Sequence, residues 1–192
     1  KRRVEKSALK LEGTAHIRSF QDKYEKLKAL NPQVEILKPE ISEDGRRVRF
    51  DFLQGRTLEQ KLADEIQDGK APVEALKKAL DFLLGPGEEQ GAPFQVTPAF
   101  TEVFGNIPYI GGISGPATNL DGLFENWMET EGKLCAIDYE WVFDFPIPAR
   151  FVRYRLLYYF YNRYQGRMDC SGLPEFLKNF GISQEHAAVY AG

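Results

Sequence analysis

The sequence predicts a mixed α+β fold, because strand and helix patterns alternate early in the chain and helical patterns dominate afterwards. Residues 1–66 give the order strand, helix, strand, strand, connector, helix. The chain has 192 residues, enough to bury a core as one domain or as two small lobes that share one. Hydrophobic residues make up 43% of it and charged residues 28%, so the composition favours a folded chain over a disordered one.

The first two elements are expected to be a short strand and a long helix. The strand lies within residues 1–9 and carries Lys6. From Thr14 to Leu30, apolar and aromatic side chains recur at steps of three and four residues, which indicates one buried face of an amphipathic helix. Asn31-Pro32 ends this helix, because a proline disfavours helical geometry in the residue before it.

A pair of strands and a second helix follow. Residues 34–37 form an apolar run typical of a strand, and Ser42–Gly45 contains an Asp-Gly pair, a strong hairpin signal. Arg47–Leu53 alternates charged and apolar residues, as in a strand with one solvated face. A capping-box pattern then opens a helix expected at Leu58–Ile66.

The middle of the chain combines one clear helix with glycine-rich connections. Pro72 starts a helix that runs to about Leu84. Gly85–Pro93 is an expected loop, whereas the aromatic segment Phe94–Phe104 fits neither a helix nor a strand pattern. Gly111–Pro116 lacks the spacing of a Walker phosphate loop, so a flexible connector is favoured there.

The last third predicts a hairpin and two helices. Trp127–Ile137 is expected to fold back on itself around Glu131-Gly132. Arg150–Tyr164 carries aromatic residues on nearly every side, which indicates a helix buried from several directions. Leu173–Phe180 is a short helix that ends at Gly181.

Composition excludes several classes of function. The net charge of −3 argues against a broad nucleic-acid surface, and no apolar run approaches the ~20 residues of a membrane span. Cys135 lies in an apolar run, which favours a buried structural thiol, and no close Cys/His cluster indicates zinc. The sequence shows no signal-peptide pattern, and it begins without methionine at an expected strand. We therefore expect a cytoplasmic piece of a longer protein.

Three polar residues form the main candidate site. Asn126 follows Asp121 by five residues, and Asp138 comes directly after the expected strand that ends at Ile137. A carboxylate at a rigid strand end suits a metal ligand, and Asn126 adds a neutral oxygen donor. Asp121 is then left to orient a hydroxyl group and accept its proton. Taken singly, Asp121 is more often a turn residue, and Asp138 or Lys6 a solvated charge.

The order of these residues resembles a known superfamily. Asn119-Leu120-Asp121, Asn126 and Ile137-Asp138-Tyr139-Glu140 are similar to the catalytic loop and metal-binding strand end of protein-kinase-like proteins. The nearest branch contains aminoglycoside phosphotransferases and lipopolysaccharide kinases, with His-Gly-Asp-x-x-x-x-Asn and Ile-Asp-Trp/Phe-Glu as the usual patterns. Asn119 departs from this pattern, because it stands in place of the usual histidine. The tract also resembles kinase-like modules of glycosyltransferases and methyltransferases in bacterial surface-polysaccharide synthesis.

The resemblance implies a two-lobe kinase-like fold, with a truncated small lobe at residues 1–53, lacking a glycine-rich loop, and a mainly helical lobe at 54–192. It implies an enzyme that uses ATP and Mg²⁺ to phosphorylate a hydroxyl, most simply of a sugar or glycan. The implied residue roles comprise the phosphate contact Lys6, the inter-lobe hinge residues Phe52 and Leu53 at the adenine, the base Asp121, and the metal ligands Asn126 and Asp138.

The acidic partner of Lys6 stays open between Asp22 and Glu25 on the expected helix, which also exposes His16.

Two alternatives accompany the kinase hypothesis. The first is an inactive kinase-like module that scaffolds a glycosyltransferase or methyltransferase domain. Trp127, Tyr139 and Trp141 could then form an interaction face, although core packing is favoured for them. The second, weaker alternative is a glycosidase that pairs Asp121 with Glu140, for which the sequence fixes no separation between the two carboxylates.

Overall fold

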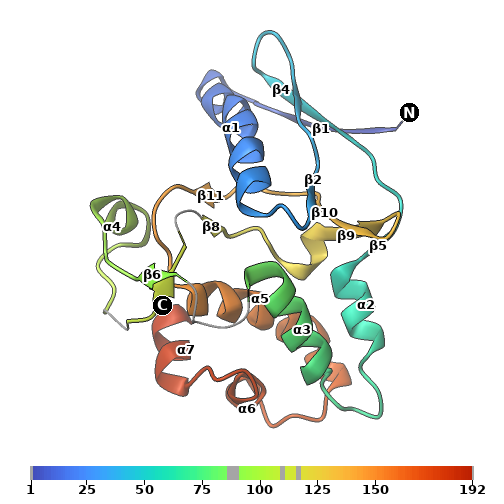
Figure 1. Ribbon diagram of the computed structural model, residues 1–192, viewed down its shortest axis with the longest axis vertical. Helices are drawn as coiled ribbons and strands as arrows, with labels where there is room; N and C mark the ends of the chain where they lie inside the picture. Colours follow the sequence, from blue (N-terminus) through green and yellow to red (C-terminus); the bar gives the residue numbers. More distant parts are fainter. Residues whose placement is uncertain (1, 86–90, 109–110, 116–117, 192) are drawn as a thin grey trace. The chain divides into compact units, whose positions relative to one another are not determined.

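The computed structural model describes residues 2–85, 91–108, 111–115 and 118–191, and it confirms the mixed α+β class (Figure 1). The chain packs as two compact units. The first unit consists of Lys1–Leu58 and Asn119–Val142, and the second of Glu59–Thr118 and Phe143–Gly192. The sequence prediction placed a single boundary between residues 53 and 54. The packing differs because the later segment pairs with strands of the N-terminal part.

The first unit contains a three-stranded antiparallel sheet in the order β1-β4-β3, formed by β1 (Arg3–Ser7), β3 (Glu40–Ile41) and β4 (Arg47–Asp51). The predicted turn at Ser42–Gly45 is confirmed, and Gly45 supplies its positive φ of 69°. The strand that enters the turn is β3, whereas the strand predicted at residues 34–37 corresponds to β2 (Glu35–Ile36) of a second sheet. The strand β4 ends at Asp51, two residues earlier than expected.

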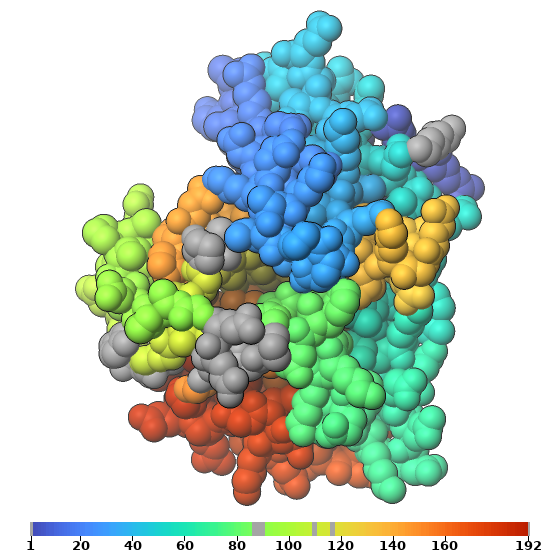
Figure 2. Space-filling view, viewed as in Figure 1, coloured from blue at the N-terminus to red at the C-terminus, as the bar shows by residue number. Residues whose placement is uncertain are grey.

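One long helix packs against this sheet. The helix α1 (Thr14–Leu30) has the predicted bounds, and Asn31 ends it by donating from its backbone and side-chain nitrogens to the Leu27 carbonyl oxygen. The outer side of α1 is visible at the surface in blue (Figure 2). The buried core of the unit comprises Ile17, Phe20, Leu27, Val48, Phe50 and Tyr139.

A second, four-stranded sheet carries the segment of the predicted site. Its order is β2-β10-β9-β5, with β2 (Glu35–Ile36), β5 (Arg56–Thr57), β9 (Trp127–Thr130) and β10 (Lys133–Ala136). The β9–β10 hairpin is confirmed, with positive φ at both Glu131 and Gly132. Because β10 lies parallel to β2, the residues after β10 belong to the first unit.

The second unit is mainly helical. Its core is dominated by α5, which buries side chains on several sides as the sequence predicted. The helices are α2 (Leu58–Asp64), α3 (Val73–Leu84), α4 (Pro98–Phe104), α5 (Ala149–Tyr164), α6 (Leu173–Lys178) and α7 (Gln184–Ala191). No helix in the described ranges is both long and apolar enough to cross a membrane.

The remaining elements are short. They are the 3₁₀ turns η1 (Leu11–Gly13), η3 (Phe124–Asn126) and η4 (Gln165–Arg167) and the strands β6 (Ala92–Pro93), β7 (Ile113–Ser114), β8 (Thr118–Asn119) and β11 (Val142–Phe143). The strands β6 and β7 pair antiparallel, so parts of both expected loops form strands. Residues 86–90 and 116 of those loops lie outside the described residues.

Two helices escaped the sequence prediction. The helix α4 begins after Thr97, whose hydroxyl accepts a hydrogen bond from the Phe100 N–H at 3.2 Å, and Pro98 occupies the first turn. The helix α7 begins after Ser183, whose hydroxyl accepts from the His186 N–H at 3.2 Å. Both are standard N-cap arrangements that the apolar pattern alone did not reveal.

Candidate functional site

The first unit gathers six charged or titratable side chains, which we call the polar cluster. Lys6 comes from β1, two members come from α1, Asp121 precedes η3, and two members follow β10. The members are Lys6, His16, Lys23, Asp121, Asp138 and Glu140. Sequence reasoning had selected Lys6, Asp121 and Asp138 as site residues, and the structure brings these three into one electrostatic neighbourhood.

Lys6 binds two carboxylates. Its Nζ donates to Asp138 Oδ1 at 2.8 Å and also to Glu140 Oε1. Burial lowers the pKa of Lys6, but the hydrogen bonds and charges of the two acids outweigh burial, so the pKa is raised overall. The ammonium is therefore firmly protonated at neutral pH, and it lies 5.7 Å from the centre of the Phe20 ring.

Neither of the two acids that the sequence left open as partners of Lys6 binds it in the structure. Asp22 and Glu25 are exposed on α1, and Glu25 accepts a hydrogen bond from Gln21 at 2.9 Å instead. The acids that bind Lys6 lie 132 and 134 residues later in the chain. An expectation based on one helix face could not include them.

Glu140 joins Lys6 to helix α1. Its Oε2 lies 3.4 Å from His16 Nε2, and its main-chain oxygen accepts from Lys23 Nζ at 2.5 Å. Burial raises the pKa of Glu140, but Lys6 and His16 lower it by more, so this carboxylate stays ionised. Burial is also the main cause that lowers the pKa of Lys23.

Backbone contacts hold Asp121 in place. Its N–H donates to Asn119 Oδ1 at 3.0 Å, and its Oδ2 accepts from the Trp141 N–H at 2.7 Å. Burial raises the pKa of Asp121; the Trp141 N–H opposes this, and the charge of Asp138 adds to it. Asn119 thus closes an Asx turn onto the Asp121 N–H.

Hydrogen bonds of both its side chain and its main chain hold Asn126 in place. Its Nδ2 donates to the Asp121 main-chain oxygen at 2.8 Å, and its own main-chain oxygen accepts from the Ile137 N–H at 2.9 Å. These bonds tie η3 to the segment that carries Asp138. They also leave Oδ1 as the end of the amide suited to a cation.

The donor set fits a magnesium ion that arrives with phosphate groups. In the described ranges, no group of three or more His, Cys, Asp or Glu side chains is arranged to hold a metal ion alone. Mg²⁺ commonly binds through one or two carboxylates together with phosphate oxygens and water, and Asp138 with Asn126 Oδ1 matches such a partial set.

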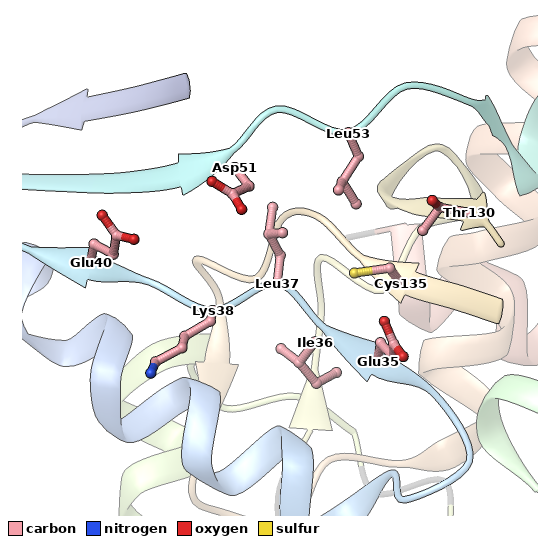
Figure 3. Close-up of a pocket in the computed structure, with 9 residues that line it drawn as sticks. All are labelled: Glu35, Ile36, Leu37, Lys38, Glu40, Asp51, Leu53, Thr130 and Cys135. Atoms are coloured by element: carbon pink, nitrogen blue, oxygen red, sulfur yellow. The ribbon is translucent and has the colours of Figure 1, made fainter. Parts of the chain in front are cut away.

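The two predicted hinge residues have different surroundings. Leu53 points into a cavity of about 280 Å³, whereas the Phe52 side chain is exposed and lies 6.0 Å from the Arg2 guanidinium (Figure 3). The cavity is lined by Glu35, Ile36, Leu37, Lys38, Glu40, Asp51, Leu53, Thr130 and Cys135. This lining contains no member of the polar cluster. The predicted adenine contacts of Phe52 and Leu53 stay a prediction.

Acids that line the cavity are already neutralised by basic residues. Glu40 lies 2.7 Å and Asp51 3.1 Å from the Arg3 guanidinium, and Glu35 lies 2.8 Å from Lys133 Nζ. The cavity therefore combines apolar side chains with acids that are paired to basic residues, and it carries no concentrated negative charge.

Cys135 is the buried structural thiol that the sequence predicted. It is 3% exposed, and burial raises the pKa of its thiol from 9.0 to about 11, so its thiolate fraction at neutral pH falls about 100-fold.

We expect iodoacetamide to alkylate Cys170, which is half-buried, well before Cys135 in the native protein. Peptide mass spectrometry measures both rates. Equal rates for the two thiols in the native state would contradict this, and urea-unfolded protein provides the control in which both react.

The aromatic residues of this region divide between core and surface. Trp127 is 6% and Tyr139 0% exposed, as expected for core packing, whereas Trp141 is 57% exposed. Sequence reasoning missed Lys23 as a neighbour of the site. A helical signal existed, because Lys23 follows His16 by seven residues and Phe20 by three, which places all three on one face of α1.

The chain matches no protein-family model, no curated protein and no solved structure.

Proposed function

We propose that this chain is a kinase-like phosphotransferase that moves the γ-phosphoryl group of ATP to a hydroxyl of a sugar or glycan. The observation that carries the proposal is the meeting of Lys6 with Asp138 beside Asp121, across 132 residues of sequence. A cation for phosphate, an acid for a metal and an acid for a hydroxyl are the groups that phosphoryl transfer requires.

The proposed architecture is a kinase-like pair of lobes. Two features of the separate units support it. In the first unit, an antiparallel sheet carries the candidate lysine on β1 and packs against α1. The second unit is mainly helical. The two units interleave along the chain, because Asn119–Val142 returns to the first unit, so the proposal rests on the content of each unit and not on their order.

Each residue of the proposed site has a role that its surroundings support. Lys6 would contact the phosphate oxygens, and Asn126 with Asp138 would hold Mg²⁺. The bound ion would supply positive charge to the phosphate oxygens during transfer. Asp121 would orient the acceptor hydroxyl and take its proton, a role that suits a carboxylate whose pKa burial raises and whose Oδ2 is fixed by the Trp141 N–H.

The acceptor class rests on the sequence resemblance. The tract Ile137-Asp138-Tyr139-Glu140 is similar to kinases that phosphorylate sugars and to kinase-like modules of bacterial surface-polysaccharide synthesis. We therefore propose a cytoplasmic setting, in which ATP is supplied, and a glycosyltransferase or methyltransferase domain as an associated partner.

A non-catalytic scaffolding module is the second candidate. It is favoured by one specific observation: Lys6, Asp138 and Glu140 already satisfy one another in direct ion pairs. Such ion pairs could serve a structural role by holding strand β1 to the segment that follows β10. Nucleotide binding separates the two candidates, since only the phosphotransferase has to exchange these ion pairs for phosphate and metal contacts.

We expect ATP with Mg²⁺ to raise the melting temperature of the protein. A ligand at 100 times its Kd stabilises the native state by about 2.7 kcal/mol, which corresponds to a rise of about 5–10 °C for a chain of this size. Differential scanning fluorimetry with ATP·Mg²⁺, with ATP plus EDTA and with Mg²⁺ alone measures the effect.

Two variants make this measurement specific. Lys6→Ala should lose the shift, whereas Lys77→Ala should keep it, because Lys77 is exposed on α3 and pairs locally with Glu74. A wild-type protein whose melting temperature is indifferent to millimolar ATP·Mg²⁺ would favour the scaffolding module.

A further inference from the structure

Glu140 contacts three other members of the polar cluster, namely Lys6, His16 and Lys23. Sequence reasoning had considered it only as a possible partner of Asp121. We infer that Glu140 is the positioning residue of Lys6 and that it replaces an acid on helix α1 by binding Lys6 and His16 through its two carboxylate oxygens. The inference rests on the proposed function in one respect, namely that Lys6 contacts phosphate. The contact geometry itself is independent of that function.

Glu140 binds both elements that flank it. One carboxylate oxygen accepts from Lys6 Nζ on β1, and the other lies 3.4 Å from His16 Nε2 on α1. Its main-chain oxygen accepts from Lys23 Nζ at 2.5 Å, and Lys23 lies about two turns after His16 on the same face of α1. A single residue therefore connects the candidate phosphate lysine to the helix that packs beside its strand.

Helix α1 offers no acid of its own for this task. Its acidic residues Asp22 and Glu25 are exposed and make no contact with Lys6 that the structure records, and the residues of α1 that contact the cluster are His16, Phe20 and Lys23. Lys23 would repel Lys6 if no anion lay near both of them. Glu140 supplies that anion with its side chain and an oriented carbonyl dipole with its main chain.

The two carboxylates that bind Lys6 can serve different roles. Asp138 is the proposed metal ligand, and a carboxylate that serves a divalent cation shares less of its charge with a lysine. Glu140 is then the partner that keeps the Lys6 ammonium in place. Lys6 and Glu140 are 27% and 32% exposed at their side chains, so water screens this pair less than a surface ion pair.

The buried residue between the two acids fixes their direction. Tyr139 is fully buried, and its hydroxyl donates to the Leu37 main-chain oxygen at 2.6 Å. Because Tyr139 enters the core, Asp138 and Glu140 on either side of it both reach Lys6. The position of Glu140 is thus set by the fold rather than by a flexible loop.

The test compares Glu140→Gln, which keeps size and hydrogen-bonding capacity but removes the charge, with Glu140→Asp, which keeps the charge. Glu5→Gln is the matched control, because Glu5 is the neighbour of Lys6 on β1 and pairs with Arg49 at 2.6 Å. Two measurements are made on each protein: KM for ATP·Mg²⁺ against kcat, and the rate at which acetic anhydride acetylates Lys6, followed by peptide mass spectrometry.

We expect Glu140→Gln to raise KM for ATP about tenfold with a smaller change in kcat, since the charge-assisted bond acts through Lys6 in binding. Acetylation of Lys6 should become severalfold faster, because the amine then keeps only one of its two carboxylate partners and is more accessible to the reagent. Glu140→Asp should restore part of both values, and Glu5→Gln should resemble wild type in both. A Glu140→Gln protein with wild-type KM and wild-type Lys6 acetylation overturns the inference.

The acetylation rate keeps this inference distinct from the proposed function. If the wild-type protein transfers no phosphate but Lys6 is acetylated faster in Glu140→Gln, the proposed function falls and the positioning of Lys6 by Glu140 stands. If the variant does not fold by circular dichroism, His16→Gln provides the second test. Loss of the His16 contact to Glu140 should then also accelerate acetylation of Lys6. An unchanged acetylation rate in His16→Gln overturns the inference.

Discussion

Asp138→Asn should reduce phosphoryl transfer about 10²- to 10³-fold while leaving the fold intact, which is the size of effect seen when one preorganised electrostatic group is removed from an active site. The asparagine keeps the shape of the side chain but loses the charge that the proposed Mg²⁺ requires. Transfer of radiolabelled γ-phosphate to a panel of mono- and oligosaccharides measures the loss. A variant with full turnover would rule out Asp138 as the metal ligand.

Stability should change little in the same variant. Asp138 is 37% exposed at its side chain, and Lys6 keeps Glu140 as a partner, so the lost ion pair should cost about 1 kcal/mol or less. Asp44→Asn is the matched control in the first unit, because Asp44 lies in the β3–β4 turn and bonds only there, to Ser42 and Arg46. It should keep full transfer activity. Urea unfolding of both variants shows whether activity and stability separate as expected.

Local sequence patterns predicted the elements that local forces determine. The helix α1 was predicted with its correct bounds, because its apolar face and the Asn31-Pro32 stop lie within one stretch of chain. Both hairpins were predicted from their turns, where Gly45 and Gly132 accept positive φ. The short helix α4 was missed, since aromatic residues without clear periodicity obscured the Thr97 cap.

Long-range pairing was the part that the sequence could not provide. The parallel pairing of β2 with β10 joins residues about a hundred positions apart, and no local sequence pattern predicts it. That pairing places Asp138 and Glu140 in the unit that contains Lys6. For this reason the candidate residues Asp121, Asn126 and Asp138 could be selected from their order, whereas the pairing of Lys6 with Asp138 and Glu140 could not be predicted.

The connection between core and site can be tested at Tyr139. Its ring is fully buried and packs edge-on against Phe20 and Phe50, with centroids at 5.7 and 6.1 Å. Tyr139→Ala should therefore lower the free energy of unfolding by about 3–5 kcal/mol, the usual cost of removing a buried aromatic side chain. Tyr139→Phe should cost about 1–2 kcal/mol, because it leaves the buried Leu37 carbonyl oxygen without the donor at 2.6 Å.

A nearby exposed side chain supplies the control. Trp141 belongs to the same segment but is 57% exposed, so Trp141→Ala should change the unfolding free energy by about 1 kcal/mol or less. Urea denaturation followed by far-ultraviolet circular dichroism measures all three variants. If Tyr139→Ala were no less stable than Trp141→Ala, the core would not depend on this ring. The direction of Asp138 and Glu140 could then not be attributed to the burial of the residue between them.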